Sequence, residues 1–157
     1  MVIHTGDVYP HFEVPVVGGG TISLPDDLAG SFGVVLFNRG SWCPYCSAQL
    51  AGFARATDAL ADAGVRVVSL SVDDETTAAE MVAKRRLPFP VGHSADAGKL
   101  SDLTGAFTNP DPLYLQSTGF VLDPHGTVVN AVYSTGAIGR LVADDVVGLV
   151  RYLKDHA

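Results

Sequence analysis

The chain has 157 residues, of which 47% are apolar and 17% charged, a composition that excludes a disordered chain and predicts one compact domain over residues 1–157. The net charge of −7 argues against nucleic-acid and anionic-membrane partners, because both attract basic surfaces. The segment from Met1 to Asp7 lacks the basic and apolar regions of a signal peptide, and no segment is apolar over the length of a membrane span. We therefore expect a cytoplasmic protein without membrane partners.

The first part of the chain predicts a hairpin, a buried strand and a long helix. Phe12–Val17 and Thr21–Leu24 flank a run of glycines and are expected to pair as a hairpin. The continuous apolar run Phe32–Phe37 is typical of a central strand that is covered on both faces. From Pro44 the apolar residues recur at helical spacing as far as Gly64, which predicts one helix over that stretch.

The remainder of the chain predicts further strands and helices in alternation. The expected elements are a buried strand at Val65–Val72, a helix capped by Asp73 or Asp74 and running through Val82, a helix at Ala97–Ala106, an irregular loop at Thr108–Gln116, two strands at Thr118–Leu122 and Thr127–Val132 joined by a tight turn, and a closing helix with an apolar stripe from Val142 to Leu153. This order indicates an α/β fold with helices flanking a sheet.

The only two cysteines, Cys43 and Cys46, stand three positions apart between the buried strand and the long predicted helix. If Cys43 is the helix N-cap, Pro44 occupies the first helical position, where its missing N–H costs nothing. The Cys43 sulfur then faces the free N–H groups and the positive end of the helix dipole. Such a setting favours the thiolate and lowers the cysteine pKa from its ordinary value of about 8.5. The pattern predicts a redox-active dithiol.

A structural disulfide and a zinc site explain the same cysteines less well. A disulfide that closes a two-residue loop stabilises a fold very little, because the stabilisation grows with loop length. A structural zinc ion needs four ligands, and the histidines do not supply the remaining two at ligand spacing. The histidines are His4, His11, His93, His125 and His156. We expect no metal and no bound cofactor.

Several stretches resemble the peroxiredoxin-like branch of the thioredoxin superfamily, the alkyl hydroperoxide reductase and thiol-specific antioxidant type. They are Gly6-Asp7-x-x-Pro10-x-Phe12, Ile22-Ser23-Leu24-x-x-x-Leu28-x-Gly30, the Val34–Phe37 strand leading into Trp42-Cys43-Pro44-Tyr45-Cys46, and Phe120-Val121-Leu122-Asp123-Pro124-x-Gly126. The resemblance implies a thioredoxin-like α/β fold in which helices flank a central mixed sheet, with an added N-terminal β-hairpin.

The resemblance assigns the two sulfurs in two different ways. In the thioredoxin and glutaredoxin pattern, Cys43 is the nucleophile and Cys46 resolves the intermediate. In the peroxiredoxin pattern Pro-x-x-x-Thr-x-x-Cys, Cys46 takes the peroxidatic position, Cys43 replaces the threonine and Arg39 replaces the proline. Ser117 stands where a late peroxiredoxin arginine is usual, and no proline precedes Thr118, where thioredoxins carry a cis-proline. The chain therefore departs from both patterns.

Residues close to the cysteines are the supporting candidates. Arg39 either stabilises a thiolate and orients a peroxide oxygen or is simply exposed at the strand end. Trp42 is expected to shield the disulfide as an apolar cover, and Ser41 either donates a hydrogen bond to a sulfur or is an ordinary loop residue. The Pro44-Tyr45 pair between the cysteines looks like that of a glutaredoxin.

These observations predict an antioxidant thiol–disulfide oxidoreductase that cycles a Cys43–Cys46 disulfide and is regenerated by an external dithiol. The reductant is expected to be a thioredoxin-like or glutaredoxin-like protein or a low-molecular-weight thiol, and the substrate a disulfide or a hydroperoxide. Disulfide reduction is expected to be the faster activity, because Arg39 is the only charged donor nearby in the sequence. The alternatives are a peroxiredoxin proper with peroxidatic Cys46, and a non-catalytic binding protein gated by its disulfide. The sequence leaves the oligomeric state open, a homodimer included.

Overall fold

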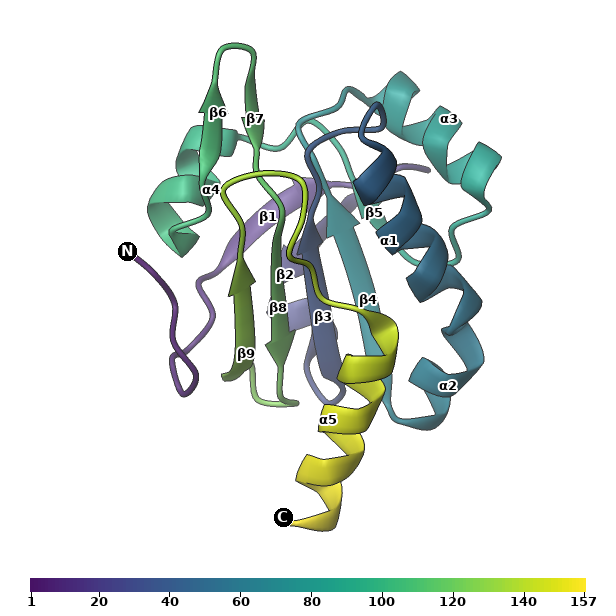
Figure 1. The fold of residues 1–157 in the computed structure, drawn as a ribbon, viewed down its shortest axis with the longest axis vertical. Coiled ribbons are helices and arrows are strands. Elements are labelled where there is room, and N and C mark those ends of the chain that lie inside the picture. Colours follow the sequence, from purple (N-terminus) through teal and green to yellow (C-terminus); the bar gives the residue numbers. More distant parts are fainter.

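A central five-stranded mixed sheet organises the molecule, and the computed structural model describes all 157 residues (Figure 1). The strand order is β5-β4-β3-β8-β9, with β3 and β5 parallel to β4, and β8 antiparallel to β3 and β9. The strands are β3 (Phe32–Phe37), β4 (Val65–Leu70), β5 (Val91–Gly92), β8 (Thr118–Leu122) and β9 (Val128–Tyr133). A mixed sheet flanked by helices confirms the predicted fold class.

The two faces of the sheet bury two separate apolar cores, because successive side chains of a strand point to opposite sides. On β3, Val35 and Phe37 join one core, whereas Val34 and Leu36 join the other. Every one of these residues is fully buried. The uninterrupted apolar run of the central strand is therefore explained by burial on both faces.

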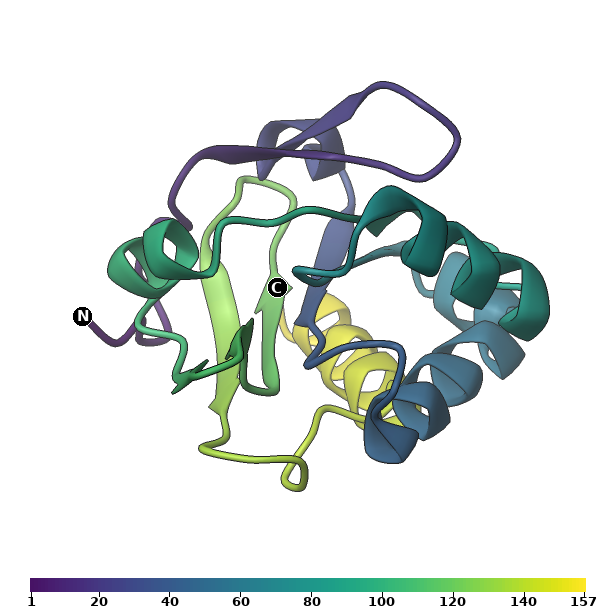
Figure 2. The ribbon, with the colours of Figure 1, turned by 90° about the horizontal axis from the view of Figure 1, so that it is seen from above.

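Helices α1, α2, α3 and α5 contribute to one core, whereas α4 and the N-terminal hairpin contribute to the other (Figure 2). The helices are α1 (Pro44–Arg55), α2 (Thr57–Asp62), α3 (Glu75–Arg85), α4 (Ala97–Thr104) and α5 (Ala143–Asp155), and the hairpin consists of β1 (Phe12–Pro15) and β2 (Thr21–Leu24), followed by a short 3-10 helix at Asp26–Leu28. The predicted N-terminal hairpin is thus confirmed, and its first strand ends two residues earlier than expected.

Two of the predicted caps are seen in the structure. Cys43 is the N-cap of α1 with Pro44 in the first turn, and Asp74 is the N-cap of α3, where its carboxylate accepts a hydrogen bond from the Thr77 N–H. Helix α3 ends at Arg85, and the following residue, Arg86, adopts the left-handed conformation that often terminates helices.

The type or the number of secondary-structure elements differs from the prediction in three places. The segment Thr108–Gln116, expected as an irregular loop because of its prolines, contains the hairpin of β6 (Thr108–Pro110) and β7 (Leu113–Leu115). Pro110 lies at the end of β6 and Pro112 in the turn, so neither proline occupies the middle of a strand, where it would cost a ladder bond.

The long helix predicted from Pro44 to Gly64 is instead divided into α1 and α2. Ala56 departs from helical geometry between them, and the Thr57 hydroxyl donates to the Ala54 carbonyl at 2.6 Å, which gives that freed carbonyl a partner. Strand β5 was not expected, because its two residues are too few to show a period.

No helix of the structure combines the length and the apolar character needed to cross a bilayer.

Candidate functional site

The two cysteines lie at the carboxyl end of β3, where the chain leaves the sheet and enters α1. This edge of an α/β sheet is a common place for functional groups. Cys43 and Cys46 expose 0% and 1% of their surface, and both sulfurs are free thiols. The Cys46 N–H donates to the Cys43 sulfur at 3.3 Å, as expected of an N-cap side chain.

Two guanidinium groups converge on the sulfurs. Arg39 Nη1 lies 3.7 Å from the Cys43 sulfur, while Arg140 Nη2 lies 3.1 Å from the Cys46 sulfur and 3.7 Å from that of Cys43. The backbone N–H of Arg39 also donates to the Cys46 sulfur at 3.3 Å. Two arginines from distant parts of the chain therefore contact the same pair of sulfurs.

The surroundings favour a thiolate on Cys43 and a thiol on Cys46. Burial raises the pKa of Cys43, but hydrogen bonds from the thiol and N–H of Cys46 and from Arg39, together with the charge of Arg140, bring that pKa below its ordinary value. Burial and the hydrogen bond with Cys43 raise the pKa of Cys46 more than the Arg39 N–H and Arg140 lower it. Of the two sulfurs, Cys43 at the helix N-terminus is therefore the one on which a negative charge is favoured.

Arg39 is held by the segment that contains β7. Its Nε donates to the Gln116 Oε1 at 3.0 Å and its Nη2 to the Tyr114 hydroxyl at 3.2 Å. The guanidinium also lies 5.0 Å from the centre of the Trp42 ring, and Trp42 packs edge-on against Tyr114. Trp42 is 56% exposed, and its ring covers the Arg39 guanidinium that lies beside the Cys43 sulfur.

Arg140 is the functional residue that sequence reasoning missed. It lies in the connection from β9 to α5, where its Nη1 donates to the Gln49 Oε1 at 2.7 Å and its Nε to the Ala137 carbonyl at 2.6 Å. Neither its spacing from the cysteines nor a local motif marks it. The only sequence signal was Ser117 at the place where a peroxiredoxin arginine is usual, because it indicated that a guanidinium at the site would have to come from another part of the chain.

Neither arginine at the sulfurs pairs with a carboxylate, since the only ion pairs in the structure join histidines to Asp26 and Glu75. In addition, no group of three or more histidine, cysteine and acidic side chains is gathered in a way that could hold a metal ion. The positive charge of the two guanidinium groups is therefore not neutralised by a paired carboxylate.

The other predicted residues have structural positions around the site. The Ser41 N–H donates to the Asp73 carboxylate at 2.8 Å, and the Ser41 hydroxyl bonds to neither sulfur. Pro44 and Tyr45 are exposed at the start of α1. Ser117 and Thr118 are buried at the start of β8.

The side chains of Ser117 and Thr118 do not reach the sulfurs. The Thr118 hydroxyl donates to the Gln116 carbonyl at 3.0 Å, and the Ser117 carbonyl accepts a bond from the Ser134 N–H at 3.0 Å. These bonds fix the segment that presents Gln116 to Arg39. The peptide bond before Thr118 is trans, because the two cis bonds of the chain precede Pro25 and Pro112.

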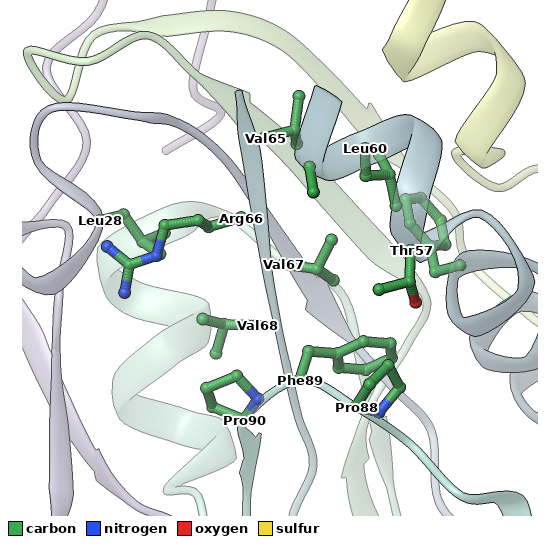
Figure 3. A pocket seen from close by; sticks show the side chains of 12 residues that line it. Leu28, Thr57, Leu60, Val65, Arg66, Val67, Val68, Pro88, Phe89 and Pro90 are labelled. Atoms are coloured by element: carbon green, nitrogen blue, oxygen red, sulfur yellow. The ribbon is translucent and has the colours of Figure 1, made fainter. Parts of the chain in front are cut away.

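Two of the hollows in the structure bear on the site and its surroundings. A groove of about 640 Å³ runs between α1 and the start of α5 and has Tyr45, Gln49 and Arg140 in its wall. A smaller, mostly apolar pocket of about 230 Å³ is lined by Val65, Phe89 and their neighbours, at the opposite end of the sheet from the cysteines (Figure 3). Of these two hollows, only the groove is lined by an arginine that contacts the sulfurs.

Comparison with known proteins agrees with this geometry. The peroxiredoxin of Thermotoga petrophila is 26% identical over 155 residues, an alignment that covers 95% of this chain and 71% of the relative. Alkyl hydroperoxide reductase C of Mycolicibacterium smegmatis is 25% identical over 173 residues, covering 95% of this chain and 84% of the relative. Among solved structures, peroxidoxin BcpB of Mycobacterium tuberculosis has the same fold, with a TM-score of 0.82 at 22% identity over 95% of this chain and 97% of that one.

The AhpC/TSA family model matches residues 5–131, which is most of the 157-residue chain and includes both cysteines and Arg39. The match confirms the resemblance that the sequence motifs suggested. This chain belongs to the AhpC/TSA family and is a thiol-based redox enzyme.

Proposed function

We propose that this chain, as a single domain of residues 1–157, is a thiol peroxidase in which Cys43 attacks a hydroperoxide and Cys46 resolves the product. The observation that carries the proposal is the convergence of Arg39 and Arg140 on two buried sulfurs with no carboxylate partner. Preorganised cationic donors lower the barrier where negative charge develops, as it does on the oxygens of a breaking O–O bond.

The proposed first step is an attack of the Cys43 thiolate on one peroxide oxygen. The S–O bond forms as the O–O bond breaks, the alkoxide takes up a proton from water, and Cys43 is oxidised to a sulfenic acid while the hydroperoxide is reduced to an alcohol. Cys46 then loses its proton and its sulfur attacks the Cys43 sulfur, so that the S–S bond of the Cys43–Cys46 disulfide forms as the S–O bond breaks; the departing hydroxide takes up the proton that Cys46 lost and leaves as water. An external dithiol reduces this disulfide and is itself oxidised.

A hydroperoxide fits the site better than a protein disulfide does. Both sulfurs are buried, and the proline that helps thioredoxins to bind an extended substrate is absent before Thr118. The groove lined by Arg140 offers a small molecule a place next to one of the two donors. Disulfide reduction was expected to be faster because the sequence offered Arg39 as the only charged donor near the cysteines. Arg140 is a second charged donor at the sulfurs, which removes that reason.

A second assignment, with Cys46 as the attacking sulfur, is favoured by one observation. Cys46 receives the shortest guanidinium contact, 3.1 Å from Arg140, and a bond from the Arg39 N–H. Its raised pKa argues against this role, because the thiolate is the nucleophile. The two assignments differ in which cysteine is oxidised first.

The test is rapid mixing of Cys43→Ser and Cys46→Ser variants with hydrogen peroxide and with an alkyl hydroperoxide, followed by trapping of sulfenic acid and peptide mass mapping. We expect Cys46→Ser to form a sulfenic acid on Cys43 at a rate close to the native one, and Cys43→Ser to lose the first step. Sulfenic acid on Cys46 in the Cys43→Ser variant, at the native rate, would establish the second assignment. Disulfide reduction faster than peroxide reduction would restore the sequence-based expectation.

The proposal includes the reductant, the cellular compartment and the oligomeric state. A thioredoxin-like or glutaredoxin-like protein or a small thiol would reduce the disulfide, and the cytoplasm would keep a lone dithiol reduced between turnovers. A homodimer is compatible with this reaction, which needs no residue from a second copy. Turnover with a thioredoxin-type reducing system would also exclude a protein that only switches a binding surface.

A further inference from the structure

Two glutamines hold the two arginines at the sulfurs. Gln116 Oε1 accepts the Arg39 Nε–H at 3.0 Å, and Gln49 Oε1 accepts an Arg140 Nη1–H at 2.7 Å. The chain contains no other glutamine. Gln49 belongs to α1 and Gln116 lies between β7 and β8, so different elements supply the same side chain for the same task.

Each glutamine makes further hydrogen bonds besides the one with its arginine. The Gln49 Nε2 donates to the Leu141 carbonyl at 2.9 Å, which turns the amide oxygen toward Arg140. Gln116 is buried, its N–H donates to the Phe107 carbonyl at 2.8 Å, and its own carbonyl accepts the Thr118 hydroxyl. The Gln49 amide is thus held at both ends by the connection from β9 to α5, and the backbone of Gln116 is fixed beside Arg39.

The neutrality of these acceptors has an electrostatic consequence. A carboxylate at either position would bind a guanidinium more strongly, because both partners would be charged. It would also cancel the positive charge that faces the sulfurs and would repel a thiolate nearby. An amide oxygen fixes the guanidinium and leaves its charge available to the sulfur.

We propose that Gln49 and Gln116 are positioning residues that aim Arg140 and Arg39 at the two sulfurs without neutralising them, and that the absence of charge on both side chains sets the reactivity of the dithiol. The inference deepens the proposed function and rests on it only for the rate with peroxide. The reactivity of Cys43 toward an alkylating agent reports on the same field without any peroxide.

The two glutamines differ in the number of sulfurs that their arginines contact. Gln116 holds Arg39, whose guanidinium contacts Cys43 alone. Gln49 holds Arg140, which contacts both Cys43 and Cys46. A change at Gln49 should therefore affect both the first oxidation and the resolving step, whereas a change at Gln116 should affect mainly the first.

The test compares Gln49→Glu and Gln116→Glu with Gln49→Met and Gln116→Met. Glutamate keeps the size and the acceptor but adds charge, whereas methionine keeps the size and removes the acceptor. The measurement is the rate of Cys43 alkylation by iodoacetamide between pH 5 and 9, with peptide mapping, and the rate of oxidation by hydrogen peroxide. Ala61→Glu, which adds the same charge on an exposed part of α2, is the control.

We expect each glutamate variant to raise the midpoint of the alkylation profile by about one pH unit. At pH values well below the midpoint, the fraction of Cys43 present as thiolate should then be about tenfold smaller than in the native protein. The thermal midpoint should stay the same or rise, because an Arg–Glu pair replaces a neutral bond. The methionine variants should also lose reactivity toward peroxide, and Ala61→Glu should behave like the native protein. A role confined to structure predicts the opposite order, with glutamate at least as good as glutamine.

Glutamate variants that fold and alkylate with the native pH profile would overturn the inference. If burial prevents Gln116→Glu from folding, Gln49→Glu decides the question, because Gln49 is only partly buried. If the alkylation profiles shift as expected but the native protein does not react with peroxide, the proposed function fails and the inference stands.

Discussion

Cys43 and Cys46 share one turn of α1, yet their surroundings separate their chemistry. The Cys43 sulfur accepts bonds from the Cys46 N–H and from both guanidinium groups, whereas burial and the neighbouring thiolate keep the proton on Cys46. The difference follows from the N-cap geometry, which directs one sulfur at the helix terminus and places the other inside the first turn.

A limiting amount of iodoacetamide at pH 7 should therefore label Cys43 first. The pKa of Cys43 lies below the ordinary cysteine pKa of about 8.5. The thiolate is therefore lost only as the pH falls through the lowered pKa of Cys43. The alkylation rate should rise with pH and level off before it does for an unfolded control. Peptide mapping identifies the labelled sulfur, and preferential labelling of Cys46 would contradict the assignment of the nucleophile.

Replacing Arg140 by alanine should slow oxidation by hydrogen peroxide about 10²–10³-fold, the usual effect of removing one preorganised donor. Arg140→Lys should recover part of the rate, because a lysine keeps the charge but cannot bond to Gln49 and to a sulfur with the same fork geometry. Arg151→Ala, an exposed arginine on α5, is the matched control. Rapid mixing measures the rates, and an unchanged rate for Arg140→Ala would remove Arg140 from the site.

At the scale of the elements, the site depends on a link between the ends of two parallel strands. Asp73 follows β4, and its carboxylate accepts the Ser41 N–H from the loop after β3, while its N–H donates to the Ser71 hydroxyl at 3.1 Å. The link holds the loop Asn38–Trp42, which leads the chain from the sheet into the N-cap of α1.

Asp73→Ala should lower the free energy of unfolding by about 1–2 kcal/mol, because it removes a charge-assisted hydrogen bond from a partly buried loop. The reactivity of Cys43 should fall at the same time, because the loop carries Arg39. Asp73→Asn keeps an acceptor and should lose much less of both. Urea unfolding and alkylation rates test the pair, and equal losses in the two variants would show that charge rather than loop geometry matters.

Sequence reasoning predicted the elements whose signals are local. Cys43 and Pro44 at the start of α1 follow from capping rules, and the run Phe32–Phe37 follows from burial on both faces. Arg140 could not be predicted in the same way, because its contact with Cys46 joins residues 94 positions apart. The hairpin around Pro112 was missed because its strands have three residues each and its prolines favour a loop.

At the scale of the whole molecule, one sheet separates two cores, and only one of them adjoins α1 and the thiols. Phe120 on β8 belongs to the other core and packs against Tyr9 and Phe37 with ring centres 5.0 Å and 5.6 Å apart. That core ties the N-terminal hairpin and α4 to the sheet.

Phe120→Ala should reduce the free energy of unfolding by about 3–5 kcal/mol, the usual cost of removing a buried phenylalanine. Below its unfolding temperature the variant should keep the native pH profile of Cys43 alkylation, since the cavity lies on the opposite face of the sheet from α1. Phe107→Ala, at a residue that is 45% exposed, should lose much less stability. Denaturant titration and alkylation measure both effects, and a changed alkylation profile would show that the two cores are coupled.

The stack of Trp42 on Arg39 gives this molecule an optical signal of its own. Trp42 is the only indole in the chain, and it touches the guanidinium that bonds to the Cys43 sulfur. When that sulfur passes from an anion to a sulfenic acid and then to a neutral disulfide, the electric field at the indole ring changes, because Arg39 contacts both the sulfur and the ring. We expect the emission of the native protein, excited at the red edge of tryptophan absorption, to follow each redox step in real time without a label.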